Sequence, residues 1–356
     1  MEKLELEDEA DAGFIYILAR RGLLNLCTAT PNGVDINAQG GRCGNALQFA
    51  SLSGHRQFVQ LLLKKGANVN LQGGTYGNAL QAAIKGEHRE TVRLLLENGA
   101  NANTQGGAYG NALQVAIERN QKEIVKLLLK NGADVNAQSG VYGNALQAAS
   151  YWGHQDIVKL LLEKGATVNA QGGYYGNALQ AASAGEYREI MQLLLDNGAD
   201  INAQGGEYGN ALQAASCWGR QGIVKLLLEK GATVNAQGGY YGNALQAASY
   251  WGHQDIVKLL LEKDANVIAQ GGYYGNAMQA ASAGQHHEIV QLLLEKSTSV
   301  NAQTDNAPQN PSSMMLNLKL EADPQATKST TSLHPTLLCW GIFCMLGSWL
   351  FLCFLK

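Results

Sequence analysis

The stretch GGYYGNALQAASYWGHQDIVKLLLEK, from Gly238 to Lys263, decides the fold because the chain repeats it with small changes along most of its length. Its asparagine recurs at a step of 33 residues, at Asn45, Asn78, Asn111, Asn144, Asn177, Asn210, Asn243 and Asn276. A fixed step of this size is typical of repeat architectures, in which each repeat packs only on its neighbours. The 356 residues therefore predict one array, where length alone would suggest two or more globular domains.

A single repeat predicts two helices and a hairpin-like turn. Asn144 is a strong helix N-cap, and Gln147, three residues later, can reach back to it as in a capping box. The first helix is alanine-rich and ends before Gly153, and a second helix with a leucine-rich face begins at about Gln155. Gly165 occupies the position where a helix end favours a left-handed residue, and a glycine-rich turn follows.

This repeat resembles the ankyrin repeat in length and in its motifs. Residues 144–150, NALQAAS, correspond to the family's TPLHxAA opening, with Asn for Thr and Gln for His. The later family elements match Gly153-His154, Ile157-Val158, Leu160-Leu161, Gly165-Ala166 and Val168-Asn169. The resemblance covers roughly residues 13–303 and implies an all-α ankyrin-repeat solenoid of helix–turn–helix–hairpin units. The motif GGxYGNALQAAS is similar to the repeats in ankyrin arrays of filamentous fungi, which are often attached to NACHT-type ATPases.

Composition divides the chain into four segments. Residues 1–39 predict a degenerate N-terminal capping repeat, and residues 40–303 predict the array of eight ankyrin repeats. Residues 304–336 are rich in Pro, Ser, Thr, Asn and Gln, which indicates a disordered linker. Near the C-terminal end of the array, Asp264 and Ser297 replace the glycine that ends the second helix, and Ile268 replaces an asparagine.

The last segment, Leu337 to Leu355, carries no charge and is about long enough to cross the ~30 Å hydrocarbon core of a membrane as a helix. The acidic start of the chain does not resemble a secretory signal, so we expect a single-pass tail-anchored protein with its array in the cytosol. The alternative is that the tail is not a true span. The protein is then cytoplasmic.

The sequence gives no sign of catalysis, of a cofactor or of a metal site. It lacks the phosphate-binding loop motif, its cysteines show neither metal nor disulfide spacing, and its carboxylates form no convergent pair. The net charge is −3 without a basic stripe, which argues against a nucleic-acid partner. Five histidines share one repeat position at the start of the second helix, where we expect inter-repeat hydrogen bonding: His55, His88, His154, His253 and His286.

Variation among the repeats is concentrated at the hairpin tip and at the end of the first helix. These are the positions through which ankyrin repeats usually contact partners, and Tyr and Trp there are suited to binding hot spots. The predicted partner-binding residues are Tyr151, Trp152, Tyr174, Trp218, Tyr240, Tyr250, Trp251 and Tyr273. The alternative is that the tryptophans pack against neighbouring repeats. The constant tyrosines, such as Tyr142 and Tyr175, are assigned to structure.

The sequence therefore predicts a non-catalytic scaffold that binds a protein partner on its concave surface and is tethered to a membrane by its C-terminal helix. A second interpretation is a soluble recognition arm derived from a NACHT–ankyrin signalling receptor. Residues 144–164 recur letter for letter at 243–263, which indicates recent duplication within the array and fits a binding surface that changes by copying repeats.

Overall fold

The computed structural model describes residues 14–28, 34–108 and 110–303, and the chain divides into two parts, residues 1–296 and 297–356. The acidic start, the predicted linker 304–336 and the apolar segment 337–355 lie outside the described residues. Within the described ranges the regular elements are helices, joined by hairpin loops that hold isolated antiparallel bridges such as Gly172 to Gly176. No helix in these ranges has both the length and the apolarity needed to cross a membrane.

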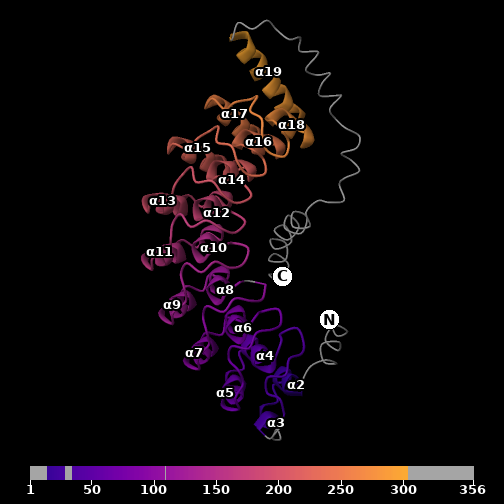
Figure 1. The fold of residues 1–356 in the computed structure, drawn as a ribbon, viewed down its shortest axis with the longest axis vertical. Coiled ribbons are helices and arrows are strands. Elements are labelled where there is room, and N and C mark those ends of the chain that lie inside the picture. Colours follow the sequence, from indigo (N-terminus) through magenta and orange to yellow (C-terminus); the bar gives the residue numbers. More distant parts are fainter. Residues whose placement is uncertain (1–13, 29–33, 109, 304–356) are drawn as a thin grey trace, which may run out of the picture. The chain divides into compact units, whose positions relative to one another are not determined.

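The helices of the array form two columns (Figure 1). The inner helices lie with the hairpin loops on the concave side of the array, and the outer helices lie on the convex side. The inner helices are α2 (Phe14–Arg20), α4 (Ala46–Leu52), α6 (Ala79–Lys85), α8 (Ala112–Glu118), α10 (Ala145–Tyr151), α12 (Ala178–Gly185), α14 (Ala211–Cys217), α16 (Ala244–Tyr250) and α18 (Ala277–Ala283). The outer helices are α3 (Leu24–Thr28), α5 (Arg56–Lys64), α7 (Arg89–Glu97), α9 (Lys122–Lys130), α11 (Gln155–Glu163), α13 (Arg188–Asp196), α15 (Gln221–Glu229), α17 (Gln254–Glu262) and α19 (His287–Gln303).

The predicted helix boundaries are confirmed. Asn144 is the N-cap of α10, and its side chain accepts a hydrogen bond of 2.9 Å from the backbone N–H of Gln147. The same bond begins each inner helix from α4 to α18. The reciprocal bond that completes a capping box forms at α10, α12 and α18. α11 begins at Gln155, and Gly165 after it has a φ of +83°.

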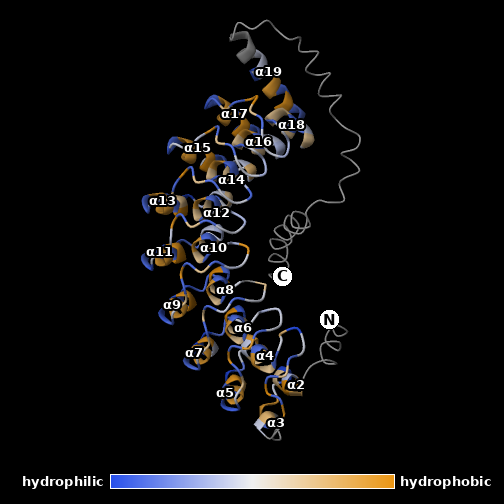
Figure 2. Cartoon of the chain, viewed as in Figure 1, coloured by the Kyte–Doolittle hydropathy of each residue, from blue (hydrophilic) through white to orange (hydrophobic). Residues whose placement is uncertain are grey.

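The buried apolar residues come from both columns of helices, and hydrophobic stretches are coloured in each column in Figure 2. In the repeat that contains α10 and α11, Leu146, Ile157, Val158 and Leu161 are at most 1 % exposed. Burying each such side chain contributes about 1.5–3 kcal/mol relative to leaving it in water. Each inner helix also packs on the inner helix of the next repeat, as α10 does on α12, so the core runs continuously along the stack. A single repeat could not bury these faces by itself.

A buried glutamine joins each repeat to the next. The Nε2 of Gln180 lies 3.2, 3.2 and 2.8 Å from the carbonyl oxygens of Ala203, Gly205 and Gly209 in the following hairpin loop. Its Oε1 accepts a hydrogen bond from the backbone N–H of Asn177. The amide therefore caps its own helix with one end, as the sequence predicts, and holds the next loop with the other, which the sequence does not indicate.

An asparagine at the base of each loop makes a second link. Asn169 donates through Nδ2 to the carbonyl oxygen of Gly198 at 2.9 Å and accepts through Oδ1 from the N–H of Asp200 at 2.9 Å. Ile268 occupies this position in the last of these loops, and its side chain is exposed. These hydrogen bonds are solvent-exposed, so each contributes little by itself, but together they help fix the register of neighbouring loops.

The two replacements of the helix-ending glycine have different outcomes. Asp264 takes the left-handed conformation, with a φ of +60°, and α17 ends at Glu262 like the other nine-residue outer helices. Ser297 does not end its helix, because α19 continues to Gln303 and is 17 residues long. An outer helix therefore ends where a residue adopts the left-handed backbone conformation. That residue is either a glycine or a residue such as Asp264 that is strained in this conformation.

Replacing Asp264 with glycine is expected to raise the free energy of unfolding by about 0.5–1 kcal/mol, because the left-handed conformation costs a residue with a Cβ roughly 1–2 kcal/mol and glycine offsets part of that gain through its freer unfolded chain. Urea denaturation of the two proteins measures the difference. The control is Asp255→Gly in the first turn of α17, which should lower stability. An unchanged or lower midpoint for Asp264→Gly would contradict the assignment of strain at this residue.

Candidate partner-binding surface

The eight aromatic residues predicted to contact a partner come from two sites in the repeat. Tyr151 and Tyr250 are the last residues of α10 and α16, and the three tryptophans are the C-cap residues of α10, α14 and α16. The other three, Tyr174, Tyr240 and Tyr273, occupy the hairpin tips. All eight therefore belong to the inner helices and loops, on the concave side of the array (Figure 1).

Their exposure separates the eight residues into two groups. Trp152, Trp218, Trp251 and Tyr273 are exposed, by 38, 38, 50 and 71 % respectively. Tyr151, Tyr174, Tyr240 and Tyr250 are half-buried. The exposed group can present more of each ring to a partner than the half-buried group can. We call these eight side chains the aromatic surface.

A layer of buried tyrosines lies beneath the aromatic surface. Tyr175, Tyr208 and Tyr241 are at most 8 % exposed and pack with the small residues of the inner helices, such as Ala184. The Tyr175 and Tyr208 rings stack with centroids 5.8 Å apart, and the Tyr151 ring lies 4.8 Å from that of Tyr175. The structural assignment of the constant tyrosines thus agrees with this burial.

This layer holds the exposed indoles in place. The Nε1 of Trp251 donates a hydrogen bond of 2.9 Å to the Oη of Tyr241, and the Trp218 ring meets Tyr208 edge-on with centroids 6.4 Å apart. Packing within their own repeat and exposure therefore coexist in Trp218 and Trp251. A ring whose orientation is already fixed loses little conformational entropy when a partner covers it, which favours binding.

The hairpin tips form a hydrogen-bonded row across the repeats. The backbone N–H of Tyr174 donates to the carbonyl of Val141, Glu207 to Tyr174, Tyr240 to Glu207 and Tyr273 to Tyr240, at 2.8–3.0 Å. The rings of Tyr240 and Tyr273 stack with centroids 5.0 Å apart and planes 15° from parallel. The tips of these loops thus form a continuous hydrogen-bonded row.

Close backbone packing between loops requires glycine at one position of each turn. Gly173 has a φ of +62°, and a Cβ placed on it would lie 2.3 Å from the carbonyl carbon of Tyr142 in the preceding repeat. The glycine-rich sequence predicts a turn in this loop. The structure adds a second reason, since the loop could not approach its neighbour with a side chain there.

The aromatic surface occupies only the repeats from α10 onward. At the equivalent helix ends nearer the N-terminus, Lys85 and Glu118 form an ion pair of 3.0 Å, and Arg119 lies 3.9 Å from Glu87. The inner side of the array is therefore polar in its N-terminal repeats and aromatic in its C-terminal repeats. A partner that recognises aromatic rings would engage the C-terminal repeats.

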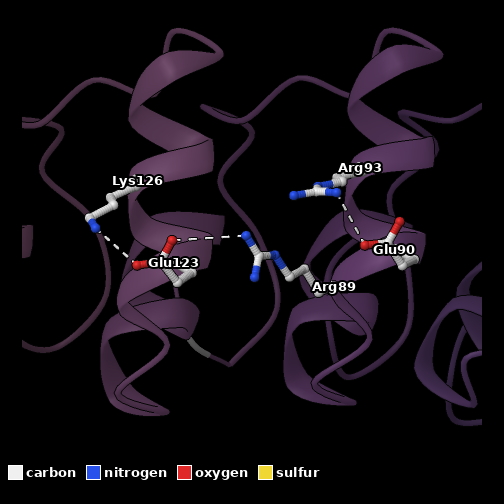
Figure 3. A network of polar contacts seen from close by, with 5 residues as sticks. All are labelled: Arg89, Glu90, Arg93, Glu123 and Lys126. Atoms are coloured by element: carbon white, nitrogen blue, oxygen red, sulfur yellow. Dashed lines mark hydrogen bonds and ion pairs between the residues drawn. The ribbon is translucent and has the colours of Figure 1, made fainter.

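The outer helices α7 and α9 carry charged residues that pair with one another (Figure 3). Glu123 of α9 pairs with Lys126 at 2.9 Å and with Arg89 of α7 at 3.8 Å, and Arg93 pairs with Glu90 at 3.3 Å. Exposed ion pairs of this kind contribute little to stability, typically 0.2–1 kcal/mol each. They keep the convex side solvated.

The histidines at the starts of the outer helices reach toward the preceding repeat. His253 is the N-cap residue of α17, but its side chain makes no capping bond. Its Nε2 lies 3.0 Å from the carbonyl oxygen of Cys217, which confirms an inter-repeat hydrogen bond at this position. A shallow pocket of about 350 Å³ lies beside it, lined by residues such as Gly219, Gln221 and Asp255.

The thiol and the phenols buried beneath the aromatic surface are held in their neutral forms. Burial raises the pKa of Cys217 to about 12 and raises the pKa of the Tyr208 and Tyr241 phenols above their ordinary value. A thiol and phenols in this state are poor nucleophiles and poor bases. Among the described residues, no group of three or more His, Cys, Asp or Glu side chains is placed to hold a metal ion.

Comparison with known proteins agrees with this architecture. A family described as ankyrin repeats (3 copies) matches the chain in four consecutive segments, at residues 15–106, 105–172, 171–238 and 239–304. No curated protein matches the chain. The matched segments cover most of the sequence and coincide with the helix pairs from α2 to α19. The chain belongs to the family of ankyrin-repeat proteins.

Proposed function

We propose that this chain is a non-catalytic scaffold that binds a protein partner through the aromatic surface. Ankyrin repeats are protein–protein interaction modules, and nothing in the family match points to catalysis. The observation that carries the proposal is the exposure of three ordered indoles, Trp152, Trp218 and Trp251, on one side of the array. Tryptophan is enriched in the few residues that supply most of the binding energy at protein interfaces.

The contrast between the two sides of the array supports this choice of surface. Interface centres are poor in charge and rich in aromatic residues, whereas the rest of a protein surface is charged. The C-terminal ends of α10, α14 and α16 are aromatic, like an interface centre. The outer helices α7 and α9 carry ion pairs, like the rest of a protein surface. The partner is therefore expected on the concave side.

The triple variant Trp152→Ala, Trp218→Ala, Trp251→Ala tests the proposal. Truncating one interface hot spot costs about 2 kcal/mol or more, which corresponds to roughly 30-fold in affinity, so removing three should abolish co-purification of the partner. The tagged full-length chain would be isolated from its source cells, and the bound proteins would be identified by mass spectrometry. Circular dichroism would establish that the variant is folded.

The chain offers a matched control in the same three repeats. Lys159, Lys225 and Lys258 are exposed on α11, α15 and α17, and replacing all three with alanine should leave the bound proteins unchanged. If the folded tryptophan variant keeps the partner and the lysine variant loses it, binding occurs on the outer helices and the proposal is wrong.

We also propose that the segment from Leu337 to Leu355 tethers the scaffold to a membrane, with the array in the cytosol. Its length and lack of charge support the proposal. Alkaline carbonate extraction followed by peptide mapping tests it. Retention of the chain in the membrane pellet, together with a recovered peptide from this segment, is the expected result, and release of the intact chain into the supernatant would contradict it.

A further inference from the structure

The three exposed tryptophans follow the step of the repeats. Trp218 and Trp251 belong to adjacent repeats, whose helices α14 and α16 pack on each other, and Trp152 lies two repeats before Trp218. The repeat between them has Gly185 at the same position. Packed helices lie 8–10 Å apart, so the indoles are spaced by one and two such steps along the inner side.

A polyproline II helix has a matching period. It has three residues per turn and rises about 3.1 Å per residue, so it returns to the same face about every 9 Å. A chain in this conformation running along the stack would present one side chain to each repeat. Prolines at positions i, i+3 and i+9 would lie over Trp251, Trp218 and Trp152 respectively, or in the reverse order. Position i+6 would lie over Gly185, against which the ring of Tyr187 packs in place of a tryptophan.

Other conformations fit this spacing less well. A β-strand presents alternate residues to one face, about 6.6 Å apart, and an α-helix has a pitch of 5.4 Å. An added strand also needs a sheet edge with free backbone groups. The described residues contain only isolated bridges, and the hairpin tips from Val141 to Tyr273 already bond to one another. Polyproline II segments have no internal hydrogen bonds and are recognised by aromatic-lined grooves.

The charge on the aromatic surface limits the ligand further. Between Val141 and Trp251, the hairpin tips and inner helix ends carry two carboxylates, on Glu186 and Glu207. Glu186 forms an ion pair of 3.1 Å with Arg220. Within the described part of the chain Glu207 has no ion-pair partner, and it lies in the row of tips between Tyr174 and Tyr240. One basic side chain on the ligand would complement it.

We propose that the aromatic surface binds a proline-rich segment of the partner in the polyproline II conformation, with prolines spaced i, i+3 and i+9 and one Arg or Lys near the residue over Trp218. The inference rests on the proposed function and specifies the chemistry of its partner. Proline rings would pack on the exposed indoles, and the basic side chain would pair with Glu207 in the loop that leads into α14.

Fluorescence anisotropy with synthetic peptides tests this inference on the full-length chain in mild detergent. The first probe is a labelled 16-residue peptide with prolines at the three specified positions and one arginine. The second has the same composition with prolines two residues apart. We expect the first peptide to bind at least tenfold more tightly, and we expect Trp218→Ala and Trp251→Ala each to weaken its binding by about 30-fold. Lys225→Ala serves as the control and should have no effect.

The charge pair gives a second readout that does not depend on ring packing. Glu207→Lys should weaken binding of the arginine peptide and strengthen binding of a second peptide in which glutamate replaces the arginine. The order of the two affinities should therefore reverse. Equal binding of the two proline spacings, or an order of affinities that Glu207→Lys leaves unchanged, would overturn the inference. If no peptide binds but Trp152, Trp218 and Trp251 are still needed to retain the cellular partner, the inference fails and the proposed function stands. If no peptide binds and the three tryptophans are not needed to retain the cellular partner, both the inference and the proposed function are wrong.

Discussion

Replacing Gly173 with alanine is expected to lower the free energy of unfolding by about 3–5 kcal/mol, through the left-handed backbone penalty and steric overpacking together. The new methyl group would lie 2.3 Å from the carbonyl carbon of Tyr142, which belongs to backbone that neighbouring hydrogen bonds hold in place. Urea denaturation followed by circular dichroism measures the loss. Amide hydrogen exchange in residues 142–180 would show that the opening is local to these two loops.

Gly165→Ala is the matched control for this prediction. Gly165 also has a positive φ, of +83°, but a Cβ there would meet nothing within 4 Å. The control therefore carries only the conformational cost of roughly 1–2 kcal/mol. A similar loss in the two variants would mean that contact between loops is unimportant and that the turn alone requires glycine.

The second large effect is expected at Gln180, whose side chain is fully buried. Gln180→Glu removes the amide donor and places a carboxylate beside the carbonyl oxygens of Ala203, Gly205 and Gly209. An uncompensated buried charge typically costs about 3–5 kcal/mol. We expect a loss of this size at pH 7, measured by urea denaturation against the parent protein.

The pH dependence of this variant distinguishes buried charge from simple loss of packing. Burial raises the pKa of the introduced carboxyl in the folded state above its unfolded value of about 4.3. The folded variant thus keeps its proton to higher pH, so the penalty is full at neutral pH and shrinks as the pH falls toward about 4.5. Gln171→Glu, on an exposed loop residue, should change stability by less than about 0.5 kcal/mol at either pH. A penalty that does not vary with pH would contradict the role of the amide donor.

The contents of one repeat could be predicted from the sequence because the signals are local. The N-cap Asn144, the break at Gly153 and the left-handed Gly165 fixed the ends of α10 and α11 within a residue or so. Each signal acts within four residues of the backbone that it governs. The apolar face of each helix also predicted which side of the helix packs into the core.

The contacts between repeats were not predictable in the same way. Gln180 bonds to residues 23–29 positions away, and Gly173 abuts the loop before it, but every repeat has nearly the same residues to offer. The sequence therefore contains no signal that matches one glutamine with one loop. It also could not show that Asp264 would end its helix and Ser297 would not, since both lack the glycine.

The aromatic surface was partly predictable. Its residues vary from repeat to repeat, which marked them as candidates for recognition, but periodicity gives no measure of exposure. Trp251 illustrates the difficulty, because half of its surface is exposed and its indole N–H is bonded to Tyr241. Packing involves one part of this side chain, and the exposed part is available for the proposed recognition.

Site-specific photo-crosslinking tests the central claim most directly, because it reports contact without removing it. A photoreactive benzoylphenylalanine would replace Trp218 on the inner side or, in a second protein, the exposed Lys225 of the same repeat. Irradiation of source cells that contain each full-length protein would then trap whatever touches that residue. A protein partner crosslinked from position 218 and not from position 225 is the predicted result. A partner trapped from position 225 and not from 218 would place recognition on the outer helices and contradict the account.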